Sequence, residues 1–399
     1  MIPLSGRAPH ANLTTPLAQR VWLLEGASTY TGQRRSRAYL VEDESPTPEG
    51  FDLYVTKSGI QLDDSVGNWV ELPPQLGYLG PGDVVSLPTG LHIRVLWRRS
   101  GRPNSVLLTE RCDNFCLMCS QPPKRAVDDW LLEDAFELVR LLPPNTPEIL
   151  FTGGEPTIYG DRFIDLMKLC KALIPGAAVH ILSNGRRFAD LDFSIAYAEI
   201  DNPNMMVGIP IYGAEPSLHD YVVQAHGAFD DTIRGILNLA RLDQPIEIRV
   251  VVHKQTAPSL VEIAEFISRN LPFVDQVALM GLEMTGFARA NVSDIWIDPI
   301  EYKAALTEAT LLLDRKGIRP MIYNHQLCLI DEQIWPFTVK SISDWKNEYH
   351  PECTNCAVIY DCGGFFYSAR HKTSDHIRAI TRDAATGPVG AAVAASSLR

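Results

Sequence analysis

The chain has 399 residues, with 36 Lys and Arg against 48 Asp and Glu, which gives a formal net charge of −12. An apolar content of 46% with 21% charged residues is typical of a globular protein and excludes a disordered or fibrous chain. The acidic balance argues against nucleic acid as the main partner, because a broad phosphate-binding face needs an excess of Lys and Arg. The length allows two or three domains.

Residues 1–103 carry short β-type runs that turn residues separate. We expect strands at 20–24, 37–41, 51–56, 83–87 and 91–97. No Cys and no recognisable catalytic cluster lies in this part of the sequence. The pattern therefore predicts a small N-terminal β-rich domain that serves as a scaffold or docking module.

Residues 104–300 alternate between strands and amphipathic helices. We expect strands at 106–109, 149–152, 179–183, 206–211, 246–252 and 274–280, and helices at 128–142, 162–173, 230–242 and 260–270. Repeated βα units predict an α/β domain with a parallel sheet, either open or closed into a partial barrel. In such sheets, ligands bind at the carboxyl ends of the strands.

The C-terminal part, residues 301–372, begins with a helix expected at 302–316 and continues as an irregular Cys-rich segment, which needs a cross-link such as a metal. Residues 373–399 end in small residues and are predicted to be a disordered tail. No apolar run approaches the roughly 18 residues that a membrane span needs. No secretory leader is visible either, so the expected location is the cytoplasm.

Thiols stay reduced in the cytoplasm, so the eight Cys are expected to bind metal or to act in catalysis rather than to form disulfides. Cys112, Cys116 and Cys119 form a CxxxCxxC loop after the first strand of the βα series. Three thiolates can ligate three irons of a cubane cluster and leave the fourth iron open. The alternative is zinc with a fourth ligand from elsewhere, although zinc sites favour CxxC pairs.

Polar and glycine residues follow the later strands of the series. After the second strand come Gly153 and Gly154, which let a backbone approach a ligand closely, then Glu155 as an acceptor for a cation and Pro156 to stiffen the turn. Ser183 and Asn184 close the next strand, and Arg249 lies on a later one. A plain polar turn and a surface ion pair remain equal alternatives for these three residues.

A second Cys set lies in the C-terminal part. Cys353, Cys356 and Cys362 form a CxxCx5CGGF segment, and Cys328 is the natural fourth ligand. Four thiols suit one further iron–sulfur cluster or a structural zinc ion. Cys170 lies at an apolar position of a helix and is expected to be part of the core.

The CxxxCxxC loop followed by the Gly-Gly-Glu-Pro turn resembles the signatures of the radical S-adenosylmethionine (SAM) superfamily. The resemblance implies a partial (β/α)6 barrel with a [4Fe–4S] cluster on Cys112, Cys116 and Cys119. It also implies reductive cleavage of SAM to a 5′-deoxyadenosyl radical, with electrons from flavodoxin or ferredoxin. The residues that it implies for SAM binding are Met118, beside the adenine, and Gly153, Gly154, Glu155, Pro156, Ser183, Asn184 and Arg249.

Residues 108–111, 118–123, 341–347 and 362–366 resemble the radical SAM maturase of the His-Xaa-Ser system, C type, and the second Cys set resembles an auxiliary-cluster extension of the SPASM or twitch type. The implied substrate is a peptide or protein with His-Xaa-Ser repeats, modified after translation. The alternatives are a radical SAM enzyme for a small molecule or nucleotide, and an iron–sulfur sensor or scaffold without turnover. No catalytic side chain is identified.

Overall fold

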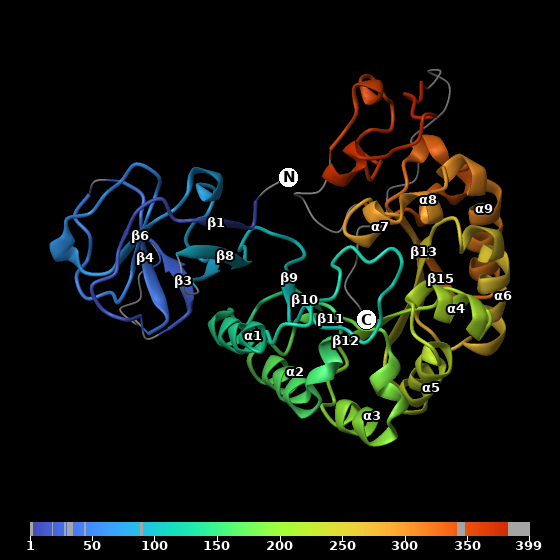
Figure 1. The fold of residues 1–399 in the computed structure, drawn as a ribbon, viewed down its shortest axis with the longest axis horizontal. Helices are drawn as coiled ribbons and strands as arrows, with labels where there is room; N and C mark the ends of the chain where they lie inside the picture. The colour runs from blue at the N-terminus through green and yellow to red at the C-terminus, as the bar shows by residue number, and fades with distance from the viewer. Residues whose placement is uncertain are drawn as a thin grey trace.

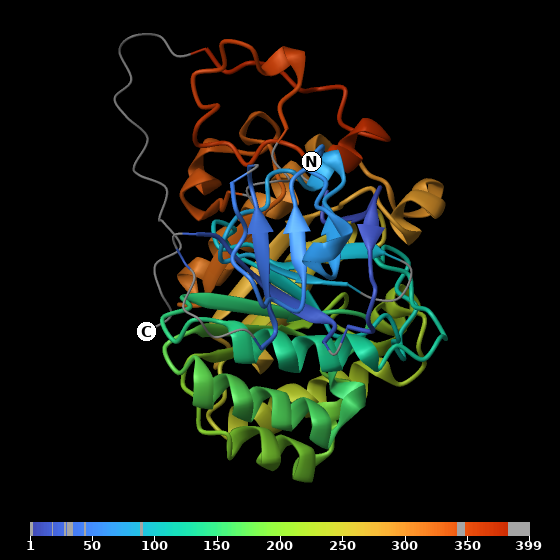
Figure 2. The same cartoon turned by 90° about the vertical axis from the view of Figure 1, so that its left-hand side faces the viewer.

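The strands of the chain gather into two sheets, one mixed and one parallel, joined by residues 98–104. The computed structural model describes residues 3–17, 19–27, 29, 35–43, 45–87, 91–340 and 348–381. The predicted motif at 341–347 and most of the predicted tail, 382–399, lie outside these residues. Figure 1 shows the mixed sheet to one side of the parallel one, and Figure 2 looks onto the mixed sheet.

The N-terminal sheet confirms the predicted β-rich character of this part. Within the described residues it has eight strands in the order β1-β8-β7-β3-β4-β5-β6-β2. Its interior holds Trp22, Leu24, Leu40, Val55 and Val70, which alternate along the strands with residues of the other face. The strands are β1 (Ser5–Arg7), β2 (Ala11–Asn12), β3 (Val21–Glu25), β4 (Arg37–Val41), β5 (Tyr54–Thr56), β6 (Trp69–Glu71), β7 (Val84–Ser86) and β8 (His92–Trp97).

The second sheet is parallel throughout, and it curls into an open half-barrel with its helices on the outside (Figure 1). Its strands follow one another in chain order: β9 (Ser105–Leu107), β10 (Glu148–Thr152), β11 (Ala178–Leu182), β12 (Met205–Pro210), β13 (Ile246–Val252), β14 (Gln276–Gly281) and β15 (Arg319–Tyr323). This arrangement confirms the predicted α/β fold. Sequential parallel order brings every strand's carboxyl end to the same edge.

Helices follow the strands and cover the outer face of the half-barrel. They are α1 (Trp130–Leu141), α2 (Asp161–Leu173), α3 (Leu191–Ala198), α4 (Pro216–Val223), α5 (Ala228–Arg241), α6 (Leu260–Asn270) and α9 (Pro299–Arg315), with two short helices, α7 (Phe287–Ala290) and α8 (Val292–Ile295). The outward side chains of β13, such as Ile248 and Val250, are buried in the core with Ile263 of α6. The inner face of β13 carries Glu247 and Arg249 instead. The sheet is therefore apolar outside and partly polar inside.

The parallel sheet continues beyond residue 300, where the sequence analysis placed the start of the C-terminal part. β15 pairs with β14 in parallel, and α9, which precedes it, contributes Leu306, Ala309 and Leu313 to the same core. Pro320 lies in β15 and breaks the usual strand pattern, which is why this strand was not predicted. At the end of the described sheet a proline is tolerated, because one side of the strand needs no ladder partner.

The N-terminal domain is fixed to the half-barrel through α1. The buried carboxylate of Asp134 accepts hydrogen bonds from Arg20 Nε at 3.1 Å and from Ser86 Oγ at 2.7 Å. The guanidinium groups of Arg20 and Arg94 lie 5.0 and 4.7 Å from the centre of the Trp130 ring. These contacts combine an ion pair to a buried carboxylate with cation–π attraction.

The Cys-rich C-terminal region has short 3-10 turns and little regular structure, as predicted: η6 (Leu327–Leu329), η7 (Glu332–Phe337), η8 (Pro351–Cys353) and η9 (Tyr367–Arg370). Figure 1 shows its later part, in red, beside α7 and α8. Gln326 Nε2 donates to the Gly364 carbonyl at 2.8 Å and fixes this part to the end of β15. Among the helices of the described residues, none has the length and apolarity that crossing a membrane requires.

Candidate functional site

The loop that follows β9 holds Cys112, Cys116 and Cys119, and all three thiols are partly buried. The loop turns back on itself, since the Cys119 N–H donates to the Cys116 carbonyl at 3.0 Å. The Cys112 sulfur accepts from the Asn114 N–H at 3.4 Å. The structure thus places the predicted thiol set at the carboxyl edge of the half-barrel sheet.

Burial raises the pKa of the Cys112 thiol to about 12, and it also raises the pKa values of Cys116 and Cys119. Burial is the largest cause of the raised pKa of Cys116. The neighbouring Cys119 and Cys112 thiolates are the next largest causes, because a second negative charge close by disfavours ionisation. A bound cation reverses this cost, since it converts such thiols to thiolates and releases protons. The set therefore suits a positively charged metal group.

Three thiols on one loop can hold an iron–sulfur cluster or, with a fourth ligand, a single metal ion. In the part of the chain that the structure describes, no three His, Cys, Asp or Glu side chains are arranged to hold one metal ion. A cubane cluster is larger than an ion and holds each ligating sulfur at a different iron, so its ligands stand farther apart. Three thiols on one loop are the number that a cubane with one open iron requires.

Gly153 and Gly154 pack against the backbone of the Cys loop. A Cβ atom at Gly153 would lie 2.5 Å from the Thr109 carbonyl oxygen, and one at Gly154 would lie 2.0 Å from the Arg111 carbonyl oxygen. The Gly154 N–H donates to Thr109 O and the Glu155 N–H donates to Arg111 O, both at 2.8 Å. The sequence analysis expected these glycines to approach a ligand; in the structure, their close approach is to the loop that carries the thiols.

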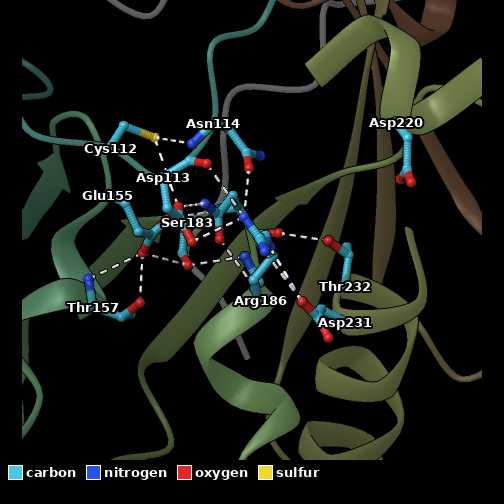
Figure 3. Close-up of polar contacts among 12 residues, drawn as sticks. Cys112, Asp113, Asn114, Glu155, Thr157, Ser183, Arg186, Asp220, Asp231 and Thr232 are labelled. Carbon is cyan, nitrogen blue, oxygen red and sulfur yellow. Dashed lines mark hydrogen bonds and ion pairs between the residues drawn. The ribbon is translucent and has the colours of Figure 1, made fainter. Parts of the chain in front are cut away.

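The Glu155 carboxylate joins the ends of β10 and β11, and Figure 3 shows it between Thr157 and Ser183. It is 1% exposed and accepts from the Thr157 N–H at 3.0 Å, from Thr157 Oγ1 at 2.7 Å, from Ser183 Oγ at 2.8 Å and from the Asn184 N–H at 2.6 Å. Burial raises the pKa of Glu155, and these hydrogen bonds oppose that rise. Three predicted residues, Glu155, Ser183 and Asn184, thus form one hydrogen-bonded group. Pro156 begins the 3-10 turn η3 (Pro156–Tyr159) beside it.

Arg186 links the Cys loop to α5, and the sequence analysis did not identify it. Its guanidinium donates to Asn114 Oδ1 at 3.1 Å and pairs with Asp113 at 3.1 Å and with Asp231 of α5 at 3.2 Å (Figure 3). Asn184 Nδ2 also donates to Asp113 Oδ1 at 2.6 Å. The residues directly after Cys112 are therefore held from the end of β11. A basic residue two positions after Asn184 was the only signal in the sequence.

Asp128, just before α1, is a second residue that the sequence analysis missed. Its buried carboxylate accepts from Thr109 Oγ1 at 2.9 Å, from Arg111 Nε at 3.0 Å and from the Glu110 N–H. All three donors directly precede Cys112. Asp128 therefore fixes the first part of the Cys loop to the start of α1.

Met118 and Arg249 lie in different surroundings. Met118 is 7% exposed and belongs to an apolar cluster with Tyr212, Val222 and Ala288. Arg249 lies on the inner face of β13, where its Nη1 donates to Glu247 Oε1 at 2.6 Å and its Nη2 lies 3.1 Å from the Met280 sulfur. This ion pair is largely buried and not on the surface. The contacts to SAM proposed for Met118 and Arg249 stay predictions.

The four C-terminal thiols lie around one pocket. Cys328, Cys353, Cys356 and Cys362 line one cavity, whose other walls include Leu327, Val358 and Ile380. Burial raises the pKa of Cys328, Cys353 and Cys362, and neighbouring thiolates add to the rise. The structure thus brings the predicted set of four thiols together around one cavity. Cys170 is fully buried in the core, as expected.

Comparison with known proteins supports one superfamily. Residues 106–267 match the family model described as the Radical SAM superfamily. This segment begins within β9 and contains β10–β13, the Cys loop and the Gly-Gly-Glu-Pro turn, so this part of the half-barrel has an α/β radical SAM fold. The N-terminal sheet, β14 and β15 lie outside the matched residues. No match was found among curated protein sequences.

Several solved structures are similar in fold at low sequence identity. Native anSMEcpe with bound AdoMet is 14% identical, with a TM-score of 0.49 over 69% of this chain and 92% of that chain. Coproporphyrinogen III oxidase (HemN) from Escherichia coli is 17% identical, with a TM-score of 0.41 over 54% and 53%. A radical SAM methyltransferase from Sphaerobacter thermophilus is 12% identical, with a TM-score of 0.40 over 62% and 71%. Similarity at this level carries no argument about substrate or activity.

Proposed function

We propose that this chain, whose residues 106–267 match the radical SAM superfamily, is a radical SAM enzyme that modifies a partner peptide or protein after translation. One observation carries the proposal. Three thiols share a loop at the carboxyl edge of the half-barrel, and the backbone of residues 153–155 is bonded directly to that loop. Positions 153 and 154 must be glycine because a Cβ atom there would collide with the backbone of the Cys loop. The Gly-Gly-Glu-Pro turn and the Cys loop therefore pack together as one structural unit.

Cys112, Cys116 and Cys119 would hold a [4Fe–4S] cluster with one iron open to SAM. When bound, the cluster and SAM together supply a 5′-deoxyadenosyl radical by one-electron reductive cleavage, with flavodoxin or ferredoxin as the proposed electron donor. The protein's own part is to hold these thiols together and to keep their surroundings dry. Asp128, Arg186 and the two glycines hold the loop from separate directions.

Glu155 is placed to orient an ammonium group. Its Oε2 accepts one hydrogen bond, from the Asn184 N–H, among the described residues, and a carboxylate oxygen can accept two. A cation at this oxygen would favour the ionised carboxylate and so oppose the effect of burial. The amino group of SAM is such a cation. Arg249, on the inner face of the sheet, offers the matching positive charge for a carboxylate.

The C-terminal thiols favour a peptide substrate over a free small molecule, because the second Cys set resembles an auxiliary-cluster extension, and such extensions are frequent in peptide-modifying maturases. Cys328, Cys353, Cys356 and Cys362 would bind one auxiliary [4Fe–4S] cluster. All four thiols line one common cavity, which places them to share one metal group. The proposed substrate is a peptide with His-Xaa-Ser repeats.

The test is an anaerobic turnover experiment on the full chain, reconstituted with iron and sulfide. Dithionite and SAM should yield 5′-deoxyadenosine and methionine, and a synthetic peptide with His-Xaa-Ser repeats should increase the yield and change its own mass. Absence of 5′-deoxyadenosine would overturn the enzyme assignment in favour of a sensor or scaffold. Product formation with no dependence on the peptide would overturn the peptide assignment alone.

A further inference from the structure

A cavity open to solvent lies at the carboxyl ends of β14 and β15. None of the predicted metal or SAM ligands in the described residues lines it. Its walls come from the ends of the two strands, the approach to α9 and the C-terminal region. They consist of Gly281, Leu282, Glu283, Met284, Trp296, Ile297, Pro299, Tyr302, Asn324, Gln326, Gly363, Gly364, Phe365, Phe366, Ser368, Ala369, Lys372, Thr373 and Ser374.

The cavity lies between the two sets of thiols. On one side, the segment after β14 lines the cavity with Glu283 and Met284, and three residues later its Phe287 N–H donates to the Cys119 carbonyl at 2.8 Å. On the other side, Gln326 and Phe365 belong to both this cavity and the pocket of the four C-terminal thiols. A molecule in the cavity would therefore be close to the loop of one set and would share a wall with the other.

The aromatic rings of the wall are held in place by other residues. The Phe365 ring stacks on His350 with ring centres 4.1 Å apart, and the Phe365 backbone exchanges two hydrogen bonds with Glu348. The Tyr302 hydroxyl and His325 Nε2 are 3.0 Å apart, and Lys372 Nζ lies 5.5 Å from the centre of the Trp296 ring. Rings that are fixed before binding lose little conformational entropy when a ligand contacts them.

The C-terminal wall is fixed to the half-barrel at two points, so the cavity has defined walls. Gln326 Nε2 donates to the Gly364 carbonyl at 2.8 Å, and Ser374 Oγ donates at 2.8 Å to Asp298, the residue that caps α9. Well-packed interiors contain few voids larger than a water molecule. A hollow lined by polar and aromatic side chains at the carboxyl ends of parallel strands is a usual place for a ligand.

The composition of the wall indicates the class of ligand. It contains one acid, Glu283, and one base, Lys372, and no Arg, so it does not suit a phosphate group. The side-chain oxygens of Asn324 and Gln326 have no hydrogen-bond partner among the described residues, and each can accept a backbone N–H. Of the four aromatic residues of the wall, Trp296 and Phe366 are partly exposed and supply contact area, whereas Tyr302 and Phe365 are buried. Amide acceptors beside aromatic rings suit a short polypeptide with an uncharged planar side chain.

We infer that this cavity binds a short stretch of the substrate polypeptide and receives one of its aromatic or imidazole side chains against the partly exposed rings of Trp296 and Phe366. The inference rests on the proposed function, for which it names the place and the side-chain class of the substrate. Ring-to-ring contact supplies the selectivity, because offset and edge-to-face pairs are favoured over contact of a ring with an aliphatic chain. The amide oxygens fix the peptide backbone.

The test uses a photoreactive peptide on the full reconstituted chain with SAM present. The probe is N-acetyl-(p-benzoyl-phenylalanyl)-glycinamide, and the crosslinked residues are mapped by mass spectrometry. We expect crosslinks within 281–302 and 363–374, and we expect N-acetyl-phenylalanyl-glycinamide to compete roughly two- to tenfold better than its leucyl counterpart. The glutamyl counterpart and adenosine monophosphate should compete less well still. Crosslinks elsewhere, or adenosine monophosphate as the best competitor, would overturn the inference.

Two variants localise the effect. Ala369→Trp fills the cavity and should abolish these crosslinks, while Ala172→Trp, at an exposed position of α2, should leave them unchanged. If Ala369→Trp fails to fold, Trp296→Leu provides the second test, since it should remove the preference for the phenylalanyl over the leucyl competitor. Unchanged crosslinking in Ala369→Trp, or an unchanged preference in Trp296→Leu, would mean that the cavity is a gap in the packing only.

Crosslinking needs no turnover, so its outcome is independent of SAM cleavage. Crosslinking at the cavity in a protein that forms no 5′-deoxyadenosine would overturn the proposed function and leave the binding site standing. Formation of 5′-deoxyadenosine without crosslinks at the cavity would overturn this inference and leave the enzyme assignment standing.

Discussion

Gly154→Ala tests whether the glycine pair is required by the Cys loop. The added methyl carbon would lie 2.0 Å from the Arg111 carbonyl oxygen, 2.5 Å from the Arg111 carbonyl carbon and 3.1 Å from the Cys112 Cβ. The two nearest atoms belong to the backbone, which cannot rotate away as a side chain would. Residues 111 and 112 must therefore move away from β10.

The cost of this movement can be worked from the contacts that it breaks. Forcing a methyl group into packed surroundings costs about 1–3 kcal/mol. The hydrogen bonds from the Gly154 N–H to Thr109 O and from the Glu155 N–H to Arg111 O are both 2.8 Å long, and each contributes about 0.5–1.5 kcal/mol. The total is about 2–6 kcal/mol, a large part of the roughly 5–15 kcal/mol by which most domains are stable.

The assay measures stability and iron at the first thiol set together. Urea unfolding of the variant should show a lower midpoint for the half-barrel transition. Anaerobic reconstitution, in a background where Cys353→Ala and Cys356→Ala disable the second set, should give less iron per chain. The matched control is Gly176→Ala in the same background, because an added Cβ at Gly176 meets no atom within 4 Å.

Equal unfolding midpoints and equal iron content in Gly154→Ala and Gly176→Ala would refute this reasoning. The glycine would then owe its place to a ligand and not to the Cys loop. A lower midpoint with full iron content would separate the two effects and show that the thiols reach the cluster even when residue 111 has moved.

Three further substitutions test the site. Cys116→Ala should abolish SAM cleavage and the iron of the first set while the C-terminal set keeps its metal, because the two sets are separate; retained cleavage, measured as 5′-deoxyadenosine, would contradict the ligand assignment. Glu155→Gln should weaken SAM binding, measured by equilibrium dialysis on the iron-loaded protein, because the amide cannot offer a charged acceptor to an ammonium; an unchanged dissociation constant would contradict its role. Asp128→Asn should lower the unfolding midpoint, because the charged hydrogen bond to Arg111 contributes about 1.5–3 kcal/mol. The substitution should also change the electron paramagnetic resonance spectrum of the reduced cluster. A spectrum identical to that of the parent chain would limit Asp128 to a role in stability.

The local features of this protein were predicted from the sequence because they depend on neighbouring residues. Cys112, Cys116 and Cys119 share one loop by their spacing alone, and the alternation of apolar runs predicted the strands from β10 to β14 nearly at their observed bounds. The same local reading missed β15, where Pro320 interrupts the pattern, although α9 and the register with β14 place it in the sheet.

Contacts between distant segments could not be predicted in this way. The sequence places Glu155 and Ser183 28 positions apart, and only the parallel pairing of β10 with β11 brings their side chains to 2.8 Å. The same applies to Arg186, which reaches across to Asp113 and Asp231.

From the sequence by itself, we could predict which Cys residues belong to each thiol set and that the core is an α/β domain. The tertiary structure decided which backbone the glycines meet, which groups hold the Cys loop, and that a cavity with aromatic walls lies between the two sets. The physical reason is the separation of the residues along the sequence. Residues of one loop are neighbours in the sequence, so their spacing alone brings them together. Contacts between loops depend on the curl and register of the sheet, which decide which loops meet at its carboxyl edge.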